Sequence, residues 1–316
     1  MSLAIMFPGQ GSQSVGMGNK LADEFPEARQ VFQEVDDALG QKLFKIISEG
    51  PEDQLTLTEN AQPALMAVSL ALVRVMESNF DIDLASNFSF AVGHSLGEYS
   101  ALAAARALSL ADTAKLLKIR GTAMQQAIPV GQGGMAAILG LDLETARALA
   151  AAASEGEVCT PANDNAPGQV VLSGHATAIS RAVEKASEFG SRRAVALQVS
   201  APFHCSLMQP AAEKMQEVLA SAEISVPTIP VVPNITVEPT QDPAVIKSLL
   251  VQQVTGMVRW RESILRLKEL GVRQLIEVGA GSVLSGLGKR IDRDLESLTV
   301  NNPEGLKILL TRLKNK

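Results

Sequence analysis

One stretch of the sequence carries the residue types of a nucleophilic active site. Residues 88–92 are mostly apolar and suit a buried strand, and Gly93-His94-Ser95-Leu96-Gly97 follows before an alanine-rich helix. This G-x-S-x-G pattern is typical of a nucleophile elbow, in which the serine stands at the tip of a sharp strand-to-helix turn. Free N–H groups at the start of the helix would stabilise a negative oxygen on a substrate carbonyl, and the Leu96 N–H is the expected donor. The pattern therefore predicts that Ser95 is a catalytic nucleophile.

A serine hydroxyl needs a base to take its proton, and the chain has three histidines. His94 lies inside the elbow, and His175 begins a helix of surface character. His204 follows the loop Ala201-Pro202-Phe203, and we predict that it is the base. Cys205 competes as a nucleophile, but it lacks an elbow, which favours the role of a small buried apolar residue. No Asp or Glu near His204 stands out as its orienting group, so a backbone carbonyl is expected to orient the ring.

Arg120 is the charged residue whose position calls for an explanation. Ser109 and Asp112 form a capping pattern for a helix that extends to about residue 126. Arg120 follows Leu116 by four residues and precedes Met124 by four, so it shares their apolar face. A guanidinium there must find an anion. Two alternatives stay open: a structural salt bridge or solvent-reaching side chain, and a clamp for a substrate carboxylate, which the planar fork of arginine fits.

A glycine loop follows the first predicted strand, which covers residues 3–7. It reads Pro8-Gly9-Gln10-Gly11-Ser12-Gln13. No Gly-Lys-Ser/Thr closes it as a phosphate loop, and Ser14 replaces the third glycine of a dinucleotide motif. The loop either presents Gln10 or its backbone to a site, or is a plain turn.

Composition excludes several classes of protein. The 316-residue chain has a net charge of −6 and no basic block, which argues against nucleic acid as a partner. The apolar runs are too short for a membrane span, and no signal peptide is expected. Cys159 and Cys205 form neither a disulfide framework nor a zinc pattern, so we expect no metal and a cytoplasmic protein.

Alternating strands and helices in residues 1–128 and 200–316 predict one discontinuous α/β domain with a mostly parallel sheet, α/β-hydrolase-like around the elbow. Residues 129–199 have the β-α-β-β-α-β order of a ferredoxin-like unit, so we predict an inserted small domain and a substrate cleft between the two domains. In this unit we expect strands at 135–139, 158–162, 169–173 and 193–199, helices at 143–153 and 176–189, and a turn at 163–168. Elsewhere we expect helices within 20–50 and at 60–76, 206–222, 243–253 and 260–270, and strands at 229–232 and 274–278.

Short motifs are spread along nearly the whole chain. They are Phe7 to Gln13, Gln62-Pro63-Ala64, Gly93 to Tyr99, Arg120-Gly121, Asn163 to Gln169, Phe203-His204-Cys205, Gln253 before Trp260, and Glu277-Val278-Gly279. With these motifs the sequence resembles the malonyl-CoA:acyl carrier protein transacylase family of acyltransferases nearly from end to end. Ala280 departs from the family pattern, in which a proline is usual, but this loop is not catalytic.

The resemblance implies transfer of malonyl from malonyl-CoA to the phosphopantetheine thiol of acyl carrier protein, for fatty acid synthesis, by ping-pong catalysis through a malonyl ester on Ser95. His204 would act as base and then as acid, and Arg120 would hold the free carboxylate. Gln10 and the Leu96 N–H would form the oxyanion hole. No cofactor is implied beyond these substrate groups, and a monomer is expected.

The resemblance also implies further substrate contacts. The Gln253 carbonyl would orient His204, and Asn163 and Asn165 would lie near the pantetheine arm. Phe203 would disfavour branched methylmalonyl groups. Met124, on the face of Arg120, is also predicted to contact substrate. Because the carrier protein is acidic, docking would need a basic patch, for which the candidates, otherwise ordinary solvated charges, are Arg192, Arg193, Lys289 and Arg290.

Three rival functions stay open at this point. A serine hydrolase or thioesterase would use the same elbow with water as acceptor. The acyltransferase component of a malonate decarboxylase or polyketide system would share every site residue. A non-catalytic scaffold that binds the carrier is a third alternative, although Ser95, His204 and Arg120 argue against it.

Overall fold

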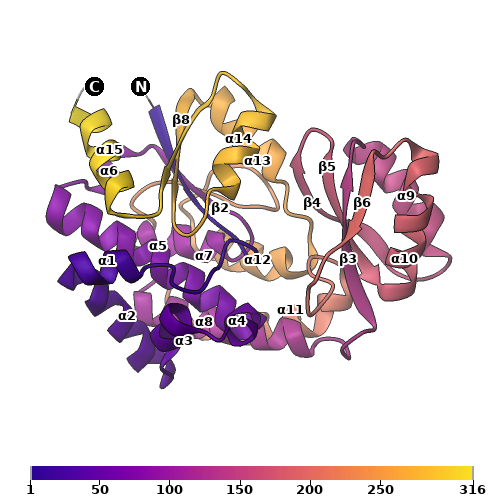
Figure 1. Cartoon of the computed structure of the whole chain (residues 1–316), viewed down its shortest axis with the longest axis horizontal. Helices are drawn as coiled ribbons and strands as arrows, with labels where there is room; N and C mark the ends of the chain where they lie inside the picture. Colours follow the sequence, from indigo (N-terminus) through magenta and orange to yellow (C-terminus); the bar gives the residue numbers. More distant parts are fainter. Residues whose placement is uncertain (1, 315–316) are drawn as a thin grey trace.

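The computed structural model describes residues 2–314, and within them the chain forms two separate β-sheets (Figure 1). In this part of the chain the larger sheet has five parallel strands, in the order β7-β2-β1-β8-β9. The predicted α/β arrangement with a parallel sheet is therefore confirmed. The edge strand β9 was not predicted, since its partly polar sequence carries no strand pattern. The strands are β1 (Ser2–Phe7), β2 (Phe90–Gly93), β7 (Val231–Val232), β8 (Val272–Val278) and β9 (Glu296–Val300).

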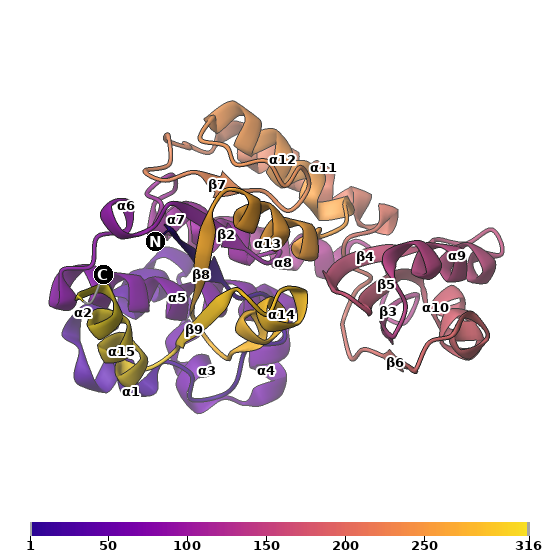
Figure 2. The ribbon, with the colours of Figure 1, turned by 90° about the horizontal axis from the view of Figure 1, so that it is seen from above.

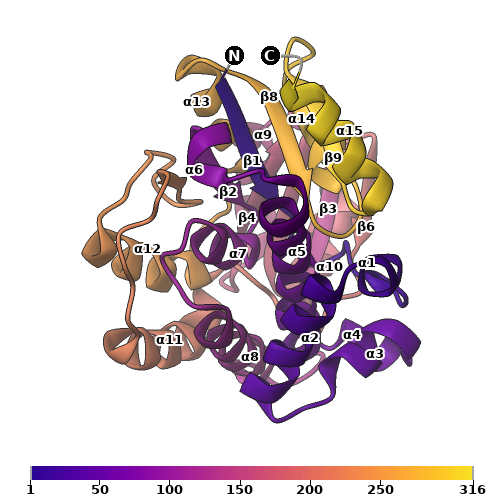
Figure 3. The ribbon, with the colours of Figure 1, turned by 90° about the vertical axis from the view of Figure 1, so that its left-hand side faces the viewer.

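Helices surround this sheet, and Figure 3 shows α11 and α12 at one side of it and α15 at the other. No helix between residues 2 and 314 combines the length and the apolar character that crossing a bilayer needs. The helices around the larger sheet are α1 (Asn19–Glu24), α2 (Pro26–Leu39), α3 (Leu43–Glu49), α4 (Glu52–Thr56), α5 (Thr58–Phe80), α6 (Leu84–Asn87), α7 (Gly97–Ala104), α8 (Leu110–Gln126), η2 (Ser206–Met208), α11 (Gln209–Ser221), α12 (Pro243–Thr255), α13 (Trp260–Glu269), α14 (Val283–Ile291) and α15 (Pro303–Lys314).

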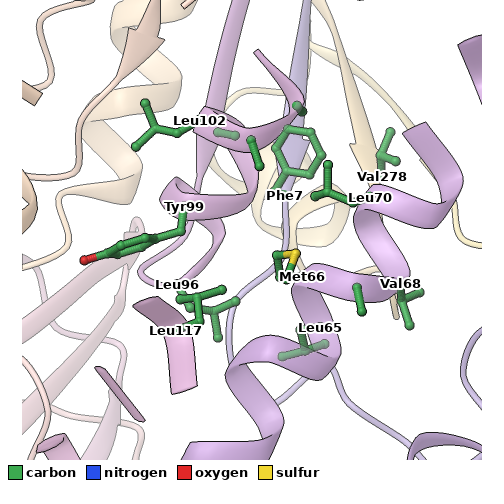
Figure 4. Packing of buried hydrophobic residues seen from close by; sticks show 14 of the residues in the cluster. Phe7, Leu65, Met66, Val68, Leu70, Leu96, Tyr99, Leu102, Leu117 and Val278 are labelled. Carbon is green, nitrogen blue, oxygen red and sulfur yellow. The ribbon is translucent and has the colours of Figure 1, made fainter. Parts of the chain in front are cut away.

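Strand β1 is buried on both faces, which explains its unbroken apolar sequence. Successive side chains of a strand point to opposite faces. Leu3, Ile5 and Phe7 accordingly join the apolar cluster formed with α5, whereas Ala4 and Met6 join a second cluster with α13 and α14. Figure 4 shows the Phe7 ring packed among side chains of α5 and α7. The loops that follow β1 and β2 are thus held on a rigid core.

The smaller sheet lies at one end of the molecule with its own two helices (Figure 2). Its neighbouring strands are antiparallel, and their order is β4-β5-β3-β6. Alanine, leucine, isoleucine and valine side chains fill the space between this sheet and the helices. The elements are β3 (Gly133–Leu139), α9 (Leu143–Ser154), β4 (Cys159–Ala166), β5 (Gln169–His175), α10 (Ala176–Lys185), η1 (Ala186–Phe189) and β6 (Arg193–Ala196).

Some predicted boundaries were wrong. Strand β4 extends to Ala166, through most of the predicted turn at 163–168. Its pairing with β5 continues past two shifts of register, and the Asp164 N–H also donates to the Val258 carbonyl at 3.0 Å. Helix α5 begins at Thr58 rather than Asn60, since its first turn bonds to the Leu57 carbonyl. Strand β6 ends at Ala196, because residues 197–199 turn to line a cavity.

Strand β4 also ties the smaller sheet to the rest of the chain. Asn163 forms a parallel bridge with Val258, and the Val258 N–H donates to the Ala162 carbonyl at 2.8 Å. Beside this bridge the buried Asp164 carboxylate pairs with Arg261 of α13 at 2.8 Å. These contacts hold the polar residues of β4 opposite the end of β2.

Candidate active site

The elbow around Ser95 has the geometry that its sequence predicts. Strand β2 ends at Gly93, α7 begins at Gly97, and Ser95 between them has a φ of 53°. A non-glycine residue in this left-handed region is strained, and persists where its surroundings enforce it. A Cβ at Gly93 would overlap the backbone of Gly97, and a Cβ at Gly97 would overlap the Phe7 carbonyl. Both glycines are needed for the strand, the turn and the helix to approach so closely.

Asn234, which follows β7, holds the elbow from the other side. Its Oδ1 accepts the Ser95 N–H at 2.8 Å, and its Nδ2 donates to the Gly93 carbonyl at 2.7 Å. The side chain is fully buried. One amide therefore satisfies the backbone on both sides of the turn and offsets the cost of the strained Ser95 conformation.

His204 lies against the serine hydroxyl. Its Nε2 is 2.8 Å from Ser95 Oγ, and its Nδ1 is 2.9 Å from the Gln253 carbonyl and 3.1 Å from the Gly256 carbonyl. Because carbonyl oxygens only accept hydrogen bonds, Nδ1 carries the proton and Nε2 presents its lone pair to the serine. The His204 backbone is also in the left-handed region, with a φ of 59°.

Electrostatics keep the imidazole neutral. Burial is the main cause that lowers the pKa of His204 to about 3, and the nearby positive charge of Arg120 is the second. A neutral imidazole with a free Nε2 lone pair is ready to accept the serine proton. The arrangement is therefore a serine–histidine pair in which backbone carbonyls orient the ring.

Arg120 meets the serine from a third direction. It is 1% exposed, and its Nη2 donates to Ser95 Oγ at 3.1 Å. The side-chain oxygens of Gln62 and Gln253 accept from the guanidinium at 2.8 and 2.9 Å. Both amides are neutral, and the Arg120 Nε is buried without a hydrogen-bond partner among residues 2–314. The sequence left a salt bridge open as one role for Arg120, but none of its hydrogen-bond partners in this part of the chain is a carboxylate.

These groups open into a cavity of about 330 Å³ between the two sheets. Clefts of about 600, 490 and 370 Å³ elsewhere on the described surface are larger, but none of them is lined by Ser95, His204 or Arg120. The chemistry of its lining, and not its size, identifies the cavity of 330 Å³ as the candidate site. Its lining includes the predicted residues Gln10, Ser95, Leu96, Arg120, Met124, Asn163, Asn165, Phe203 and His204.

Gln10 reaches this cavity from the loop after β1, in which the preceding Gly9 packs against the backbone of His94. Its Nε2 donates to the Thr58 hydroxyl at 3.3 Å, a long hydrogen bond that leaves the amide free to turn toward a ligand. Leu96 is the residue before α7, directly after the nucleophile. Gln253 does not line the cavity and lies behind His204.

The remaining histidines and cysteines have other surroundings. His94 Nε2 is 2.9 Å from Asn165 Oδ1, so this ring joins the elbow to β4. The His175 Nδ1 accepts the Val158 N–H at 2.9 Å, remote from the serine. Cys205 is buried, its thiol donates to the Pro202 carbonyl, and burial raises its pKa, which disfavours the thiolate. Its predicted role as a buried apolar residue is consistent with these contacts.

Three buried polar residues of the site were missed by sequence reasoning as functional candidates: Gln62, Glu98 and Asn234. Each is at most 2% exposed. Glu98 stands in an otherwise apolar helix directly after the elbow, and Gln62 on the small apolar face of α5, which are signals of buried polar contacts. Asn234 has no such local signal.

The comparisons with known proteins agree with this site. The family model described as acyl transferase domain matches residues 5–300. The malonyl CoA-acyl carrier protein transacylase of Bacillus subtilis (strain 168) is 44% identical over 314 residues, which cover 99% of this chain and 97% of that protein. An acyl-carrier-protein S-malonyltransferase structure from Bartonella henselae is 53% identical, with a TM-score of 0.97, and the match covers 99% of this chain and 100% of that one.

A third relative was solved with its partner. It is a malonyl-transacylase in complex with a type II PKS acyl-carrier protein, 41% identical with a TM-score of 0.95, and the match covers 100% of both chains. The resemblance stated from the sequence motifs is thus confirmed over the full length of the chain. The chain belongs to the acyl transferase family and, within it, to the malonyl CoA-acyl carrier protein transacylases.

Proposed function

We propose that this acyltransferase moves a malonyl group from malonyl-CoA to the phosphopantetheine thiol of an acyl carrier protein, through a malonyl ester on Ser95. The observation that carries the proposal is the meeting of three groups in one cavity: Ser95 Oγ lies 2.8 Å from His204 Nε2 and 3.1 Å from Arg120 Nη2. A nucleophile, a base and a carboxylate-binding cation are what transfer of a charged acyl group requires.

In the first half-reaction His204 Nε2 takes the Ser95 proton while Oγ bonds to the thioester carbonyl carbon. The tetrahedral oxyanion lies toward the Leu96 N–H and the Gln10 side chain, which act as its hydrogen-bond donors. The carbon–sulfur bond then breaks, and the imidazolium returns the proton to the leaving sulfur, so that CoA departs as a thiol.

In the second half-reaction the carrier's thiol gives its proton to His204 and its sulfur bonds to the ester carbonyl carbon. The carbon–oxygen bond breaks, and Ser95 Oγ regains a proton from the imidazolium. The Gln253 and Gly256 carbonyls hold Nδ1–H throughout, so Nε2 faces the reacting atoms in both steps.

Arg120 selects the acyl group. In a malonyl ester a single methylene separates the reacting carbonyl from the free carboxylate, so the carboxylate must bind close to Ser95. Arg120 is within hydrogen-bond distance of Ser95 Oγ and has no carboxylate among its hydrogen-bond partners in residues 2–314. An arriving carboxylate would neutralise the charge that lowers the pKa of His204, and so make the base stronger.

Further parts of the proposal concern the surroundings of the site. Asn163, Asn165, Phe203 and Met124 would contact the substrate, as cavity-lining residues. The strand order β4-β5-β3-β6 supports a division of the chain into two domains. The larger domain would comprise residues 1–128 and 200–316, and the inserted ferredoxin-like unit residues 129–199. A hydrolase-like large domain, a monomer, a cytoplasmic location and the absence of a cofactor other than the substrate groups stay predictions.

Docking of the carrier protein remains a proposal as well. The exposed Arg290 donates to Gln169 at 2.7 Å, and the Arg192 side chain lies beside Gly168, so two of the predicted basic residues flank the same turn. One relative was solved with a type II PKS acyl-carrier protein, so a polyketide carrier is the alternative to a fatty acid carrier. Measuring transfer to both carrier types distinguishes them.

The decisive experiment is mass spectrometry of the protein after incubation with malonyl-CoA alone. We expect one malonyl adduct on the peptide that contains Ser95, none in Ser95→Ala, and loss of the adduct when carrier protein is added. Rapid release of free malonate without carrier would instead identify a hydrolase. A wild-type protein that never acquires the adduct would refute the proposal.

A further inference from the structure

A buried carboxylate stands behind the site, and the mechanism above does not use it. Glu98 is the second residue of α7, one turn after Ser95, and it is 2% exposed. An unpaired charge is costly to bury, so the contacts of Glu98 reveal what this carboxylate does.

Within residues 2–314, both side-chain hydrogen bonds of Glu98 end on one oxygen, Oε2. It accepts from the Gln253 side-chain Nε2 at 2.7 Å and from the Asn234 backbone N–H at 2.9 Å. Glu98 therefore joins α7 to α12 and to the segment after β7, the elements that hold the base and the elbow.

The Gln253 amide lies between two charged groups and has two ends of opposite hydrogen-bonding character. An ionised carboxylate only accepts hydrogen bonds, and a guanidinium only donates them. Glu98 therefore takes the nitrogen end, together with the Ser95 carbonyl at 3.1 Å, and the oxygen end is left for Arg120 Nη2, at 2.9 Å. With the amide reversed, its NH₂ group would face a donor and its oxygen would face an acceptor.

We propose that Glu98 is a positioning residue, which sets the orientation of the Gln253 amide and through it holds the Arg120 guanidinium in place for the carboxylate of the acyl group. This inference rests on the proposed function. Glu98 touches no substrate, and its effect is on acyl selection more than on the chemical step, because His204 bonds to the backbone carbonyl of Gln253 and not to its side chain.

Both protonation states of Glu98 keep these contacts. Burial raises the pKa of Glu98 to about 7 against the opposing effects of the Asn234 N–H, the Gln253 amide and the positive charge of Arg120. Because both donors bond to Oε2, a proton can reside on Oε1 while Oε2 still accepts the two hydrogen bonds.

The test compares malonyl with acetyl transfer, because an acetyl group has no carboxylate for Arg120. In Glu98→Leu the Gln253 Nε2 loses the nearer of its two acceptors and keeps only the Ser95 carbonyl, at 3.1 Å. We expect the ratio of malonyl to acetyl kcat/KM to fall about 10- to 100-fold, the equivalent of one hydrogen bond to a charged group. In Glu98→Gln a single amide oxygen can replace Oε2 toward both donors, so the ratio should return to within about threefold of the wild type. Equal losses of malonyl and acetyl transfer in Glu98→Leu, or a Glu98→Gln ratio as low as that of Glu98→Leu, would overturn the inference.

A second variant keeps the inference testable if Glu98→Leu folds poorly. Gln253→Leu removes the amide and keeps the backbone carbonyl that holds His204. If Glu98 acts through this amide, Gln253→Leu by itself should lower the ratio of malonyl to acetyl kcat/KM at least as much as the loss expected for Glu98→Leu, whereas a wild-type ratio in Gln253→Leu would contradict the inference. Glu277→Gln is the matched control: Glu277 is fully buried and accepts two N–H groups of α14, at 3.0 and 2.7 Å. Glu277→Gln should lower the free energy of unfolding without changing the ratio of malonyl to acetyl kcat/KM.

The same assay separates this inference from the proposed function. If the wild type fails to transfer malonyl, or if Arg120→Ala keeps the wild-type ratio, the proposed function is wrong. If both behave as proposed and the Glu98 variants do not shift the ratio, the role of Glu98 alone is refuted.

Discussion

Arg120 supplies the sharpest test of how the site selects its acyl group. Its guanidinium is held by the neutral amide oxygens of Gln62 and Gln253 at 2.8 and 2.9 Å, and its Nε has no partner among residues 2–314. A bound carboxylate would form two charge-assisted hydrogen bonds with it. At about 1.5–3 kcal/mol for each bond, the pair contributes about 3–6 kcal/mol. An acetyl group gains nothing from this contact.

We therefore expect Arg120→Ala to lower the ratio of malonyl to acetyl kcat/KM by roughly 10²- to 10⁴-fold, since each tenfold factor corresponds to about 1.4 kcal/mol. Steady-state transfer from each acyl-CoA to the carrier protein measures the ratio. Arg120→Lys keeps the charge but not the planar fork, and should lie between the wild type and Arg120→Ala. Lys115→Ala removes one exposed charge from the same helix and serves as the control. Equal losses of malonyl and acetyl transfer in Arg120→Ala would refute the clamp.

Three other expectations concern the oxyanion hole, the base and the elbow. Gln10→Ala should lower kcat by about 10²- to 10³-fold in a folded protein, and an unchanged kcat would remove Gln10 from the hole. Because the folded-state pKa of His204 is about 3 and its ordinary value is 6.5, the unfolded chain binds the extra proton between these values, so stability falls as the pH drops through this window. Between pH 7 and pH 5 the free energy of unfolding should fall by roughly 2 kcal/mol less in His204→Gln than in the wild type. Denaturant titrations at the two pH values measure this difference, and equal decreases in both proteins would contradict the neutral buried imidazole. Gly97→Ala should lower the free energy of unfolding by about 3 kcal/mol, because its Cβ meets the Phe7 carbonyl, whereas Gly286→Ala, in a helix with open space around it, should raise it by about 0.5–1 kcal/mol. Thermal unfolding of both variants checks this contrast, and equal melting temperatures would refute the close approach.

The local sequence predicts the nucleophile elbow almost completely. An apolar strand, two glycines that flank Ser95 by two residues on each side, and a helix start are all contained within about ten residues. Steric rules that act over this distance dictate the turn. The alternation of strands and helices likewise predicted the parallel sheet, because crossover connections between parallel strands impose that order.

The errors lie where distant segments meet. Residues 163–168 were predicted to form a turn because Asn, Asp, Pro and Gly dominate that stretch, yet contacts with Val258 extend β4 as far as Ala166. Asn234 carries no local signal, although its amide closes the elbow across 139 residues of sequence. Propensity describes a residue's own backbone, and it cannot anticipate a partner that only the fold brings near.

The sequence by itself determined which residues were able to do chemistry: a serine in an elbow, one histidine after a proline-containing loop, and an arginine on an apolar helix face. The tertiary structure alone decided that they meet. Arg120 and His204 are 25 and 109 residues from Ser95 along the chain, and they reach it only because α8 and the loop before η2 pack against the end of the parallel sheet. It also decided between a salt bridge and an open cation for Arg120, since the partners of a buried charge depend on the packing of elements that are remote in sequence.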